Sequence, residues 1–177
     1  KHPDDISAVL DVALDQNYQF LFLDATGGNA DWASELMNQP RFELLSETVI
    51  EMRRRKKEEA LGLIYSGGVR SGTDAARLIA LGANAVVYGV AAALALGGEI
   101  GQSQIEWRSD RAPGERTDGL TSILNAHAGE ASMMARCTGK TCLHNLEPED
   151  LRSVTLATSA ATNIPVPGHN VTRARLL

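Results

Sequence analysis

The chain has 177 residues, of which 44% are hydrophobic and 22% charged, a composition that predicts one globular domain and argues against intrinsic disorder. Its 17 basic and 22 acidic residues give a net charge of −5, which argues against nucleic acid as a partner, because phosphate backbones are bound through an excess of Lys and Arg. No apolar run approaches the ~20 residues of a membrane helix and no signal peptide is visible, so we expect a cytoplasmic protein without a membrane partner.

The first predicted unit is a helix followed by a strand. Apolar residues such as Ile6, Leu10 and Ala13 recur at helical spacing within residues 4–16, which predicts an amphipathic helix. Residues 18–23 then form a mostly apolar run, which is typical of a strand buried on both faces of a sheet.

A second helix and strand follow. Ser46 is suited to cap this helix, which also carries a basic run at residues 53–57 among several glutamates. Such a mixed charge run predicts a solvated helix face without a chemical role. Residues 61–65 are apolar and predict the second strand.

The third unit has its start and stop signals in the sequence. A helix is expected to begin at Ser71 or Thr73 and to end at Gly82, and residues 84–88 predict the third strand. Because helices alternate with short apolar strands, the strands are expected to be parallel neighbours joined by helical crossovers.

Glycine-rich turns follow the second and third strands. Gly67 and Gly68 open the first turn, and Gly89 followed by Val90 repeats the arrangement at the second. Glycines let the backbone approach an anion, and the N–H groups that open the next helix point at it. This pairing is how a (β/α)8 barrel holds a phosphate, so we predict a phosphorylated cofactor.

The predicted fold class is α/β, as the C-terminal part of a (β/α)8 TIM barrel. A closed barrel needs at least ~200 residues, and the chain opens on Lys1 with a helix, so we expect it to start within the fold. We assign the barrel fragment to residues 1–100, a surface loop to 101–118 and a helical extension that packs on the barrel to 119–177.

Two residues of the predicted extension, His127 and Pro148, carry separate predictions. His127 falls on an apolar helical stripe and is interpreted as a core histidine rather than a catalytic base, because nothing near it in sequence orients it. Pro148 is expected to begin the last helix.

Four segments carry a family resemblance. Residues 24–30 read Asp-Ala-Thr-Gly-Gly-Asn-Ala, and residues 66–74 read Ser-Gly-Gly-Val-Arg-Ser-Gly-Thr-Asp. The most specific segments are Ala-Arg-Cys-Thr-Gly-Lys at 135–140 and His-Asn-Leu-Glu-Pro-Glu-Asp-Leu at 144–151. Together they resemble the FMN-dependent synthase domain of glutamate synthases and the stand-alone glutamate synthase-like proteins, among them the large subunit of N-methylglutamate synthase.

The resemblance implies a barrel that carries FMN, in which a 2-oxo acid condenses with ammonia or methylamine and hydride from the reduced flavin reduces the imine. Arg70 is either a bidentate phosphate ligand or the partner of a structural ion pair with Asp74. The cofactor-binding residues implied are Ser66, Gly67, Gly68, Arg70, Gly89 and Val90.

The resemblance places Thr26, Gly27, Gly28 and Asn29 at the substrate mouth, and leaves the catalytic residues unassigned. Asn29 stands where the family has Thr, and the family's lysine-bearing strands lie upstream of those present. We therefore expect a complementary polypeptide to complete the barrel in a homo- or hetero-oligomer. The alternative is a non-catalytic scaffold or regulatory barrel fragment of a complex. Another phosphate-binding barrel, such as a nucleotide dehydrogenase, is disfavoured because its cysteine loop is absent.

Larger glutamate synthases carry a three-iron cluster on a segment related to residues 131–142, with three cysteines. Cys137 and Cys142 keep one of the two spacings, but Ala131 stands at the third position. We therefore expect no iron–sulfur cluster and no other metal, and interpret the two cysteines as buried thiols rather than a disulfide.

Overall fold

The computed structural model describes residues 3–26, 41–101, 105–107 and 110–168. Strands β1 (Phe20–Asp24), β2 (Gly62–Ser66) and β3 (Ala85–Val87) form a parallel sheet in chain order. Residue Phe22 of β1 pairs with Ile64 of β2, which in turn pairs with Ala85 of β3. The three strands predicted from the sequence are confirmed, with limits shifted by one or two residues.

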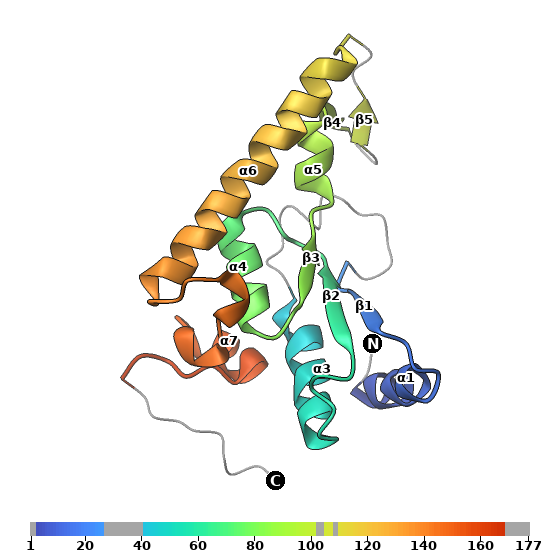
Figure 1. Cartoon of the computed structure of the whole chain (residues 1–177), viewed down its shortest axis with the longest axis vertical. Coiled ribbons are helices and arrows are strands. Elements are labelled where there is room, and N and C mark those ends of the chain that lie inside the picture. The colour runs from blue at the N-terminus through green and yellow to red at the C-terminus, as the bar shows by residue number, and fades with distance from the viewer. Residues whose placement is uncertain (1–2, 27–40, 102–104, 108–109, 169–177) are drawn as a thin grey trace.

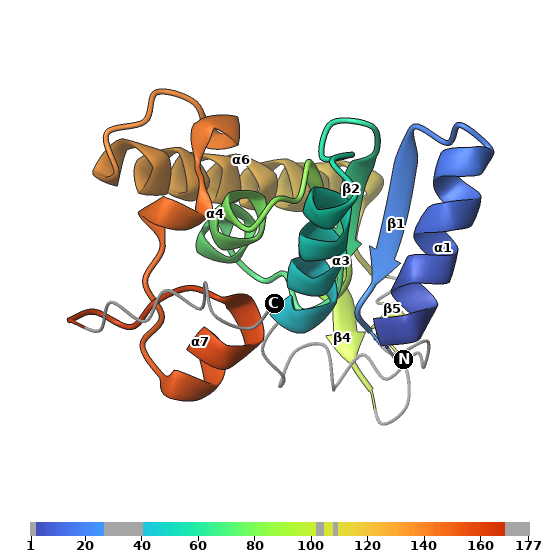
Figure 2. The same ribbon diagram turned by 90° about the horizontal axis from the view of Figure 1, so that it is seen from below.

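Helices α1 (Pro3–Asp15), α3 (Phe42–Arg54) and α4 (Gly72–Ala80) follow the sheet in that order, with α6 beyond α4 (Figures 1 and 2). Ser46 does not cap α3 as predicted, because the helix begins one turn earlier at Phe42 and buries Ser46. The core lies between the sheet and these helices. Its largest fully buried side chains are Leu10, Leu45, Leu63, Tyr65, Leu78, Val69 and Thr48.

The opposite face of the sheet is uncovered at β1 in the described part of the chain. Side chains alternate along this strand, so Leu23 is buried towards the helices, whereas Phe20 and Phe22 are 61% and 55% exposed. The expectation of a strand buried on both faces is therefore wrong for β1 in the residues described. The Phe20 ring lies beside Gly62, whose missing side chain leaves room for it.

The segment predicted as a surface loop at residues 101–118 contains regular structure. Strand β5 (Ile105–Trp107) pairs antiparallel with β4 (Gly98–Ile100), which follows the short helix α5 (Val90–Ala95). Helix α6 (Pro113–Cys137) also begins inside that range, and its N-terminal turns project beside α5 and the hairpin (Figure 1). Polar composition did not reveal the helix start, although Pro113 and Glu115 are residues typical of one.

The predicted helical extension packs on α4. Small residues of the two helices, including Ala76, Ala80, Ala131 and Ala135, form a second apolar cluster with Leu146. Pro148 opens only a short 3₁₀ turn, Pro148–Asp150, and the last helix is α7 (Leu156–Thr162), so the predicted helix start at Pro148 is wrong. None of the helices in the described ranges has the length and apolar character needed to cross a membrane.

The basic run on α3 is not only a solvated face. Arg55 is 16% exposed and its guanidinium contacts Glu51 at 2.7 Å and, on α1, Asp11 and the Ser7 hydroxyl, the latter at 2.6 Å. Arg54 also binds Glu51, through Nε at 2.7 Å. The run therefore ties α1 to α3, a contact that the local charge pattern did not reveal.

These contacts make α1 docking sensitive to acid. Hydrogen bonds from Arg54 and Arg55 lower the pKa of Glu51 from its ordinary value of 4.5 to about 2. A carboxylate with a lowered folded-state pKa stabilises the fold above its ordinary pKa, and this contribution is lost as pH falls towards 2. We expect α1 amides to exchange faster between pH 4.5 and 2, and Glu51→Gln to remove that dependence. Glu47→Gln on the same helix is the control, and equal behaviour of the two variants contradicts the assignment.

Candidate functional site

The carboxyl ends of the three strands bring the predicted site segments to one edge of the sheet. Ser66 ends β2 and pairs with Asp24 of β1 and Val87 of β3. The Ala25 amide also donates to the Ser66 carbonyl at 2.8 Å, which fixes the chain leaving β1 against the turn after β2. The turns after β1, β2 and β3 therefore start side by side, as the parallel arrangement predicts.

The turn after β2 requires glycine. Gly67 and Gly68 have φ angles of +131° and +67°, a region that residues with a side chain rarely adopt. A Cβ on Gly67 would also lie 3.1 Å from the Ala25 carbonyl carbon and Cβ. Both glycines are buried, so this turn is closely packed backbone with half-buried Ser66 and Arg70 at its ends.

The turn after β3 leads into α5. Gly89 is the residue before the helix and is exposed, whereas Val90, the first helical residue, is 4% exposed. Within the described residues no side chain caps this helix start. The first N–H groups of α5 thus lack a side-chain acceptor there, at the position where the sequence predicts the second half of an anion site.

The start of α4 is different, because protein groups already occupy it. The Ser71 hydroxyl accepts from the Asp74 amide at 3.1 Å. Glu130 of α6 accepts from the Gly72 amide at 2.8 Å and from the Thr73 hydroxyl. The hydrogen bond from Thr73 is the main cause that lowers the pKa of Glu130. The expectation that the amides opening this helix face a bound anion is therefore wrong for Gly72 and Asp74.

Arg70 forms the structural ion pair that was one of its two predicted roles. Its Nε lies 3.8 Å from Oδ2 of Asp74, and its backbone amide donates to the same oxygen at 3.2 Å. Asp74 is 6% exposed and also lies 3.5 Å from the Arg77 guanidinium. Two arginines and a backbone amide thus compensate the buried carboxylate, which holds the turn after β2 against the first turn of α4.

The end of β1 holds Thr26 in place. One Asp24 oxygen accepts from the Thr26 amide at 2.9 Å and from its hydroxyl at 2.6 Å. Thr26 is the one residue of the predicted substrate mouth that the structure describes, because Gly27, Gly28 and Asn29 lie outside the described residues. Sequence reasoning did not single out Asp24 by itself, although Asp two residues before a hydrogen-bonded amide is a recurrent turn signal.

Tyr88 and His127 meet beside the two turns. Their ring centroids are 4.9 Å apart, and the Tyr88 hydroxyl donates to the Ser71 carbonyl at 3.3 Å. Burial is the main cause that raises the pKa of Tyr88. His127, predicted as a core histidine, is half-buried rather than enclosed in an apolar stripe. Neither Tyr88 nor Glu130 was identified from the sequence, because their partners lie far away along the chain.

Two comparisons with known proteins bear on the family of this chain. The family model of the FMN-dependent dehydrogenases matches residues 41–106, which include both glycine turns. The glutamate synthase large subunit-like protein of Rhizobium meliloti (strain 1021) is 30% identical over a 172-residue alignment that covers 81% of this chain. These two matches support an FMN-dependent, glutamate synthase-like family for this chain. It spans 39% of the length of this curated relative.

Solved structures confirm the fold of this chain. A double mutant of flavocytochrome b2 with sulfite bound matches with a TM-score of 0.63 and 21% identity, covering 94% of this chain and 37% of the other. The recombinant flavin-binding domain of baker's yeast flavocytochrome b2 matches with a TM-score of 0.62 and 22% identity, covering 97% and 37%. The predicted fold class, a part of a (β/α)8 barrel, is confirmed.

Proposed function

We propose that this chain is the FMN-phosphate-binding part of a glutamate synthase-like oxidoreductase. The observation that carries the proposal is the pair of glycine turns at the carboxyl ends of the adjacent parallel strands β2 and β3. That edge is where barrel enzymes bind phosphate and place their active sites. The match to an FMN-dependent family supports the identity of the cofactor.

The residues of the turns fit a phosphate. Gly67 and Gly68 have positive φ angles and carry no side chain that would keep an anion from the backbone of this turn. Gly89 and Val90 would hold it from the other side through the uncapped start of α5. Ser66 adds a hydroxyl, and Arg70 adds charge while it stays paired with Asp74. When bound, FMN supplies hydride transfer.

We propose reductive amination as the reaction. A 2-oxo acid and an amine from a donor such as glutamine would condense above the strand ends, next to Thr26 and the predicted mouth residues Gly27, Gly28 and Asn29. The contribution of this chain is to orient the cofactor and to shape that edge, because the residues assigned here bind rather than transfer protons.

We further propose that additional β/α units, supplied by a complementary polypeptide, complete the barrel. Phe20 and Phe22 are exposed on one sheet face, whereas parallel sheets are normally covered on both. The relatives support the additional units alone, since the chain spans 39% of the curated protein and 37% of a flavocytochrome b2 chain.

Flavin content and turnover test the proposal. The assembly purified through the full chain is expected to contain FMN that bleaches on reduction and reoxidises when a 2-oxo acid is added with ammonia or methylamine. Bleaching without reoxidation by these substrates contradicts reductive amination but not FMN binding. Absence of flavin contradicts both and favours the non-catalytic scaffold.

The assembly is expected to contain no iron–sulfur cluster. Cys137 and Cys142 are both exposed, which corrects the prediction of buried thiols, and Ala131 is buried against α4 about 9 Å along the helix from Cys137. Two thiolates leave a cluster under-ligated. We expect iron and acid-labile sulfide to stay at the background of the assays, far below stoichiometric amounts. Stoichiometric iron that is lost in Cys137→Ser contradicts this prediction.

A further inference from the structure

Helix α6 reaches the turn after β2 through Glu130. Its carboxylate binds the Gly72 amide at 2.8 Å and the Thr73 hydroxyl, and thus holds the first residues of α4, the helix that follows the glycine turn. Ser71 already supplies an ordinary cap to α4 by accepting from the Asp74 amide. Glu130 is 58 residues away from Gly72 in the sequence, so its contact adds a tertiary link to a helix start that has its own local cap.

The backbones of α4 and α6 touch at the same place. A Cβ added to Gly72 would lie 2.1 Å from the His127 carbonyl oxygen and 2.7 Å from the Ala131 amide nitrogen. Because both are backbone atoms, the clash could be relieved only by moving a helix. The start of α4, to which the turn after β2 leads, is therefore positioned directly against α6.

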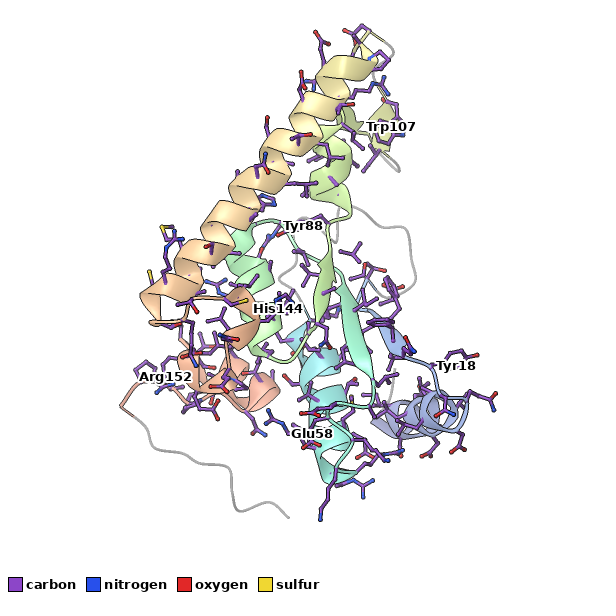
Figure 3. The ribbon with its side chains drawn as sticks, in the orientation of Figure 1. Tyr18, Glu58, Tyr88, Trp107, His144 and Arg152 are labelled. Carbon is purple, nitrogen blue, oxygen red and sulfur yellow. The ribbon has the colours of Figure 1, made fainter. Side chains whose placement is uncertain are left out.

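The same stretch of α6 also reaches the turn after β3. The His127 ring lies on Tyr88, the residue before Gly89, and the Tyr88 hydroxyl returns to the Ser71 carbonyl. Figure 3 shows Tyr88 where the chain passes from β3 to α5, beside α6. The His127 Nδ1 atom is buried without a hydrogen-bond partner among the described residues, so ring packing is the contact that the structure shows for this side chain.

We propose that Glu130 and His127 are positioning residues that hold the two glycine turns at the separation the FMN phosphate requires. The inference rests on the proposed function. Glu130 fixes the turn after β2 through the start of α4, and His127 fixes the turn after β3 through Tyr88. The two are three residues apart, so they lie on one face of the same helix. A phosphate bound between the turns would depend on the distance that this face imposes.

Selectivity for FMN over riboflavin tests the inference, because riboflavin lacks the phosphate. In the purified assembly, Thr73→Val removes the hydroxyl that Glu130 accepts from, whereas Thr73→Ser retains it. We expect Thr73→Val and Glu130→Gln to weaken FMN binding about tenfold, the scale of one hydrogen bond to a charged group, and to leave riboflavin binding unchanged. Thr73→Ser is expected to behave as the unmodified protein.

Ring packing is tested in the same way. His127→Ala is expected to lower FMN affinity, and His127→Phe to restore it, because Phe keeps an aromatic ring on Tyr88.

Asp118→Asn is the matched control for Glu130→Gln, since it removes the same charge from an exposed position on α6.

Three results would overturn the inference. Unchanged FMN affinity in Thr73→Val and Glu130→Gln means that α6 does not position the turns. An equal loss of FMN and riboflavin affinity means that these residues serve only the stability of the fold. If the unmodified assembly bound neither flavin, the proposed function would fail and the inference with it. If the variants bound FMN with the same preference over riboflavin as the unmodified assembly, the inference would fail but the proposed function would stand.

Discussion

Gly68→Asp is expected to abolish FMN binding in an assembly that still folds. Gly68 has a φ of +67°, so a side chain there costs roughly 1–2 kcal/mol in backbone strain. The new carboxylate would also face the phosphate, and two like charges about 4 Å apart repel by about 4 kcal/mol near a protein surface. The repulsion alone predicts a loss of affinity of about 1000-fold, whereas the strain lowers the stability of the fold with or without flavin. Flavin absorbance per chain after desalting measures it.

Gly68→Asn separates the two causes. Asn has nearly the shape of Asp and tolerates positive φ angles better than most residues, but it carries no charge. We expect Gly68→Asn to retain part of the flavin and Gly68→Asp to retain none, with similar circular dichroism in both. Full flavin content in Gly68→Asp would show that the phosphate does not bind at this turn.

Local signals explain why the sheet could be predicted from the sequence. The runs at residues 18–23 and 61–65 are short and apolar, and each is followed by glycine within a few residues, so strand and turn are both encoded in adjacent positions. The cap of α4 was also predictable, because Ser71 acts on Asp74 three residues later. The structure changed the limits of these three parallel strands but not their direction, and it added the β4–β5 hairpin in the segment predicted as a loop.

Contacts between distant segments explain what could not be predicted. Nothing near Glu130 in the sequence indicates that it binds Gly72, and the closed start of α4 follows from that contact. The acid-sensitive link through Arg55 likewise depends on the position of α1, which lies far from Arg55 in the sequence. The charge run at residues 53–57 therefore predicts only a solvated helix face when it is considered by itself. The exposure of Cys137 depends on where α6 ends beyond its packing on α4.

Expressed without further strands, the 177-residue chain is expected to aggregate or to lack a cooperative thermal transition. The edge strand β1 carries exposed aromatic rings at Phe20 and Phe22, and such edges pair with other chains. Near-ultraviolet circular dichroism and size-exclusion chromatography measure the outcome. A monomer with a sharp near-ultraviolet spectrum and a cooperative melting transition would show that the described sheet needs no covering units.

Phe22→Glu is expected to prevent the chain from joining the proposed complementary polypeptide. In a completed barrel position 22 would face the interior, where an unpaired carboxylate costs several kcal/mol to bury. Val154→Glu is the control, because Val154 is 91% exposed and lies in the C-terminal extension away from the sheet. We expect assembly mass and flavin content to fall with Phe22→Glu and to stay unchanged with Val154→Glu. If both variants assembled equally well, the exposed face of β1 would not be the surface on which the barrel is completed, and the additional units would have to join the sheet elsewhere.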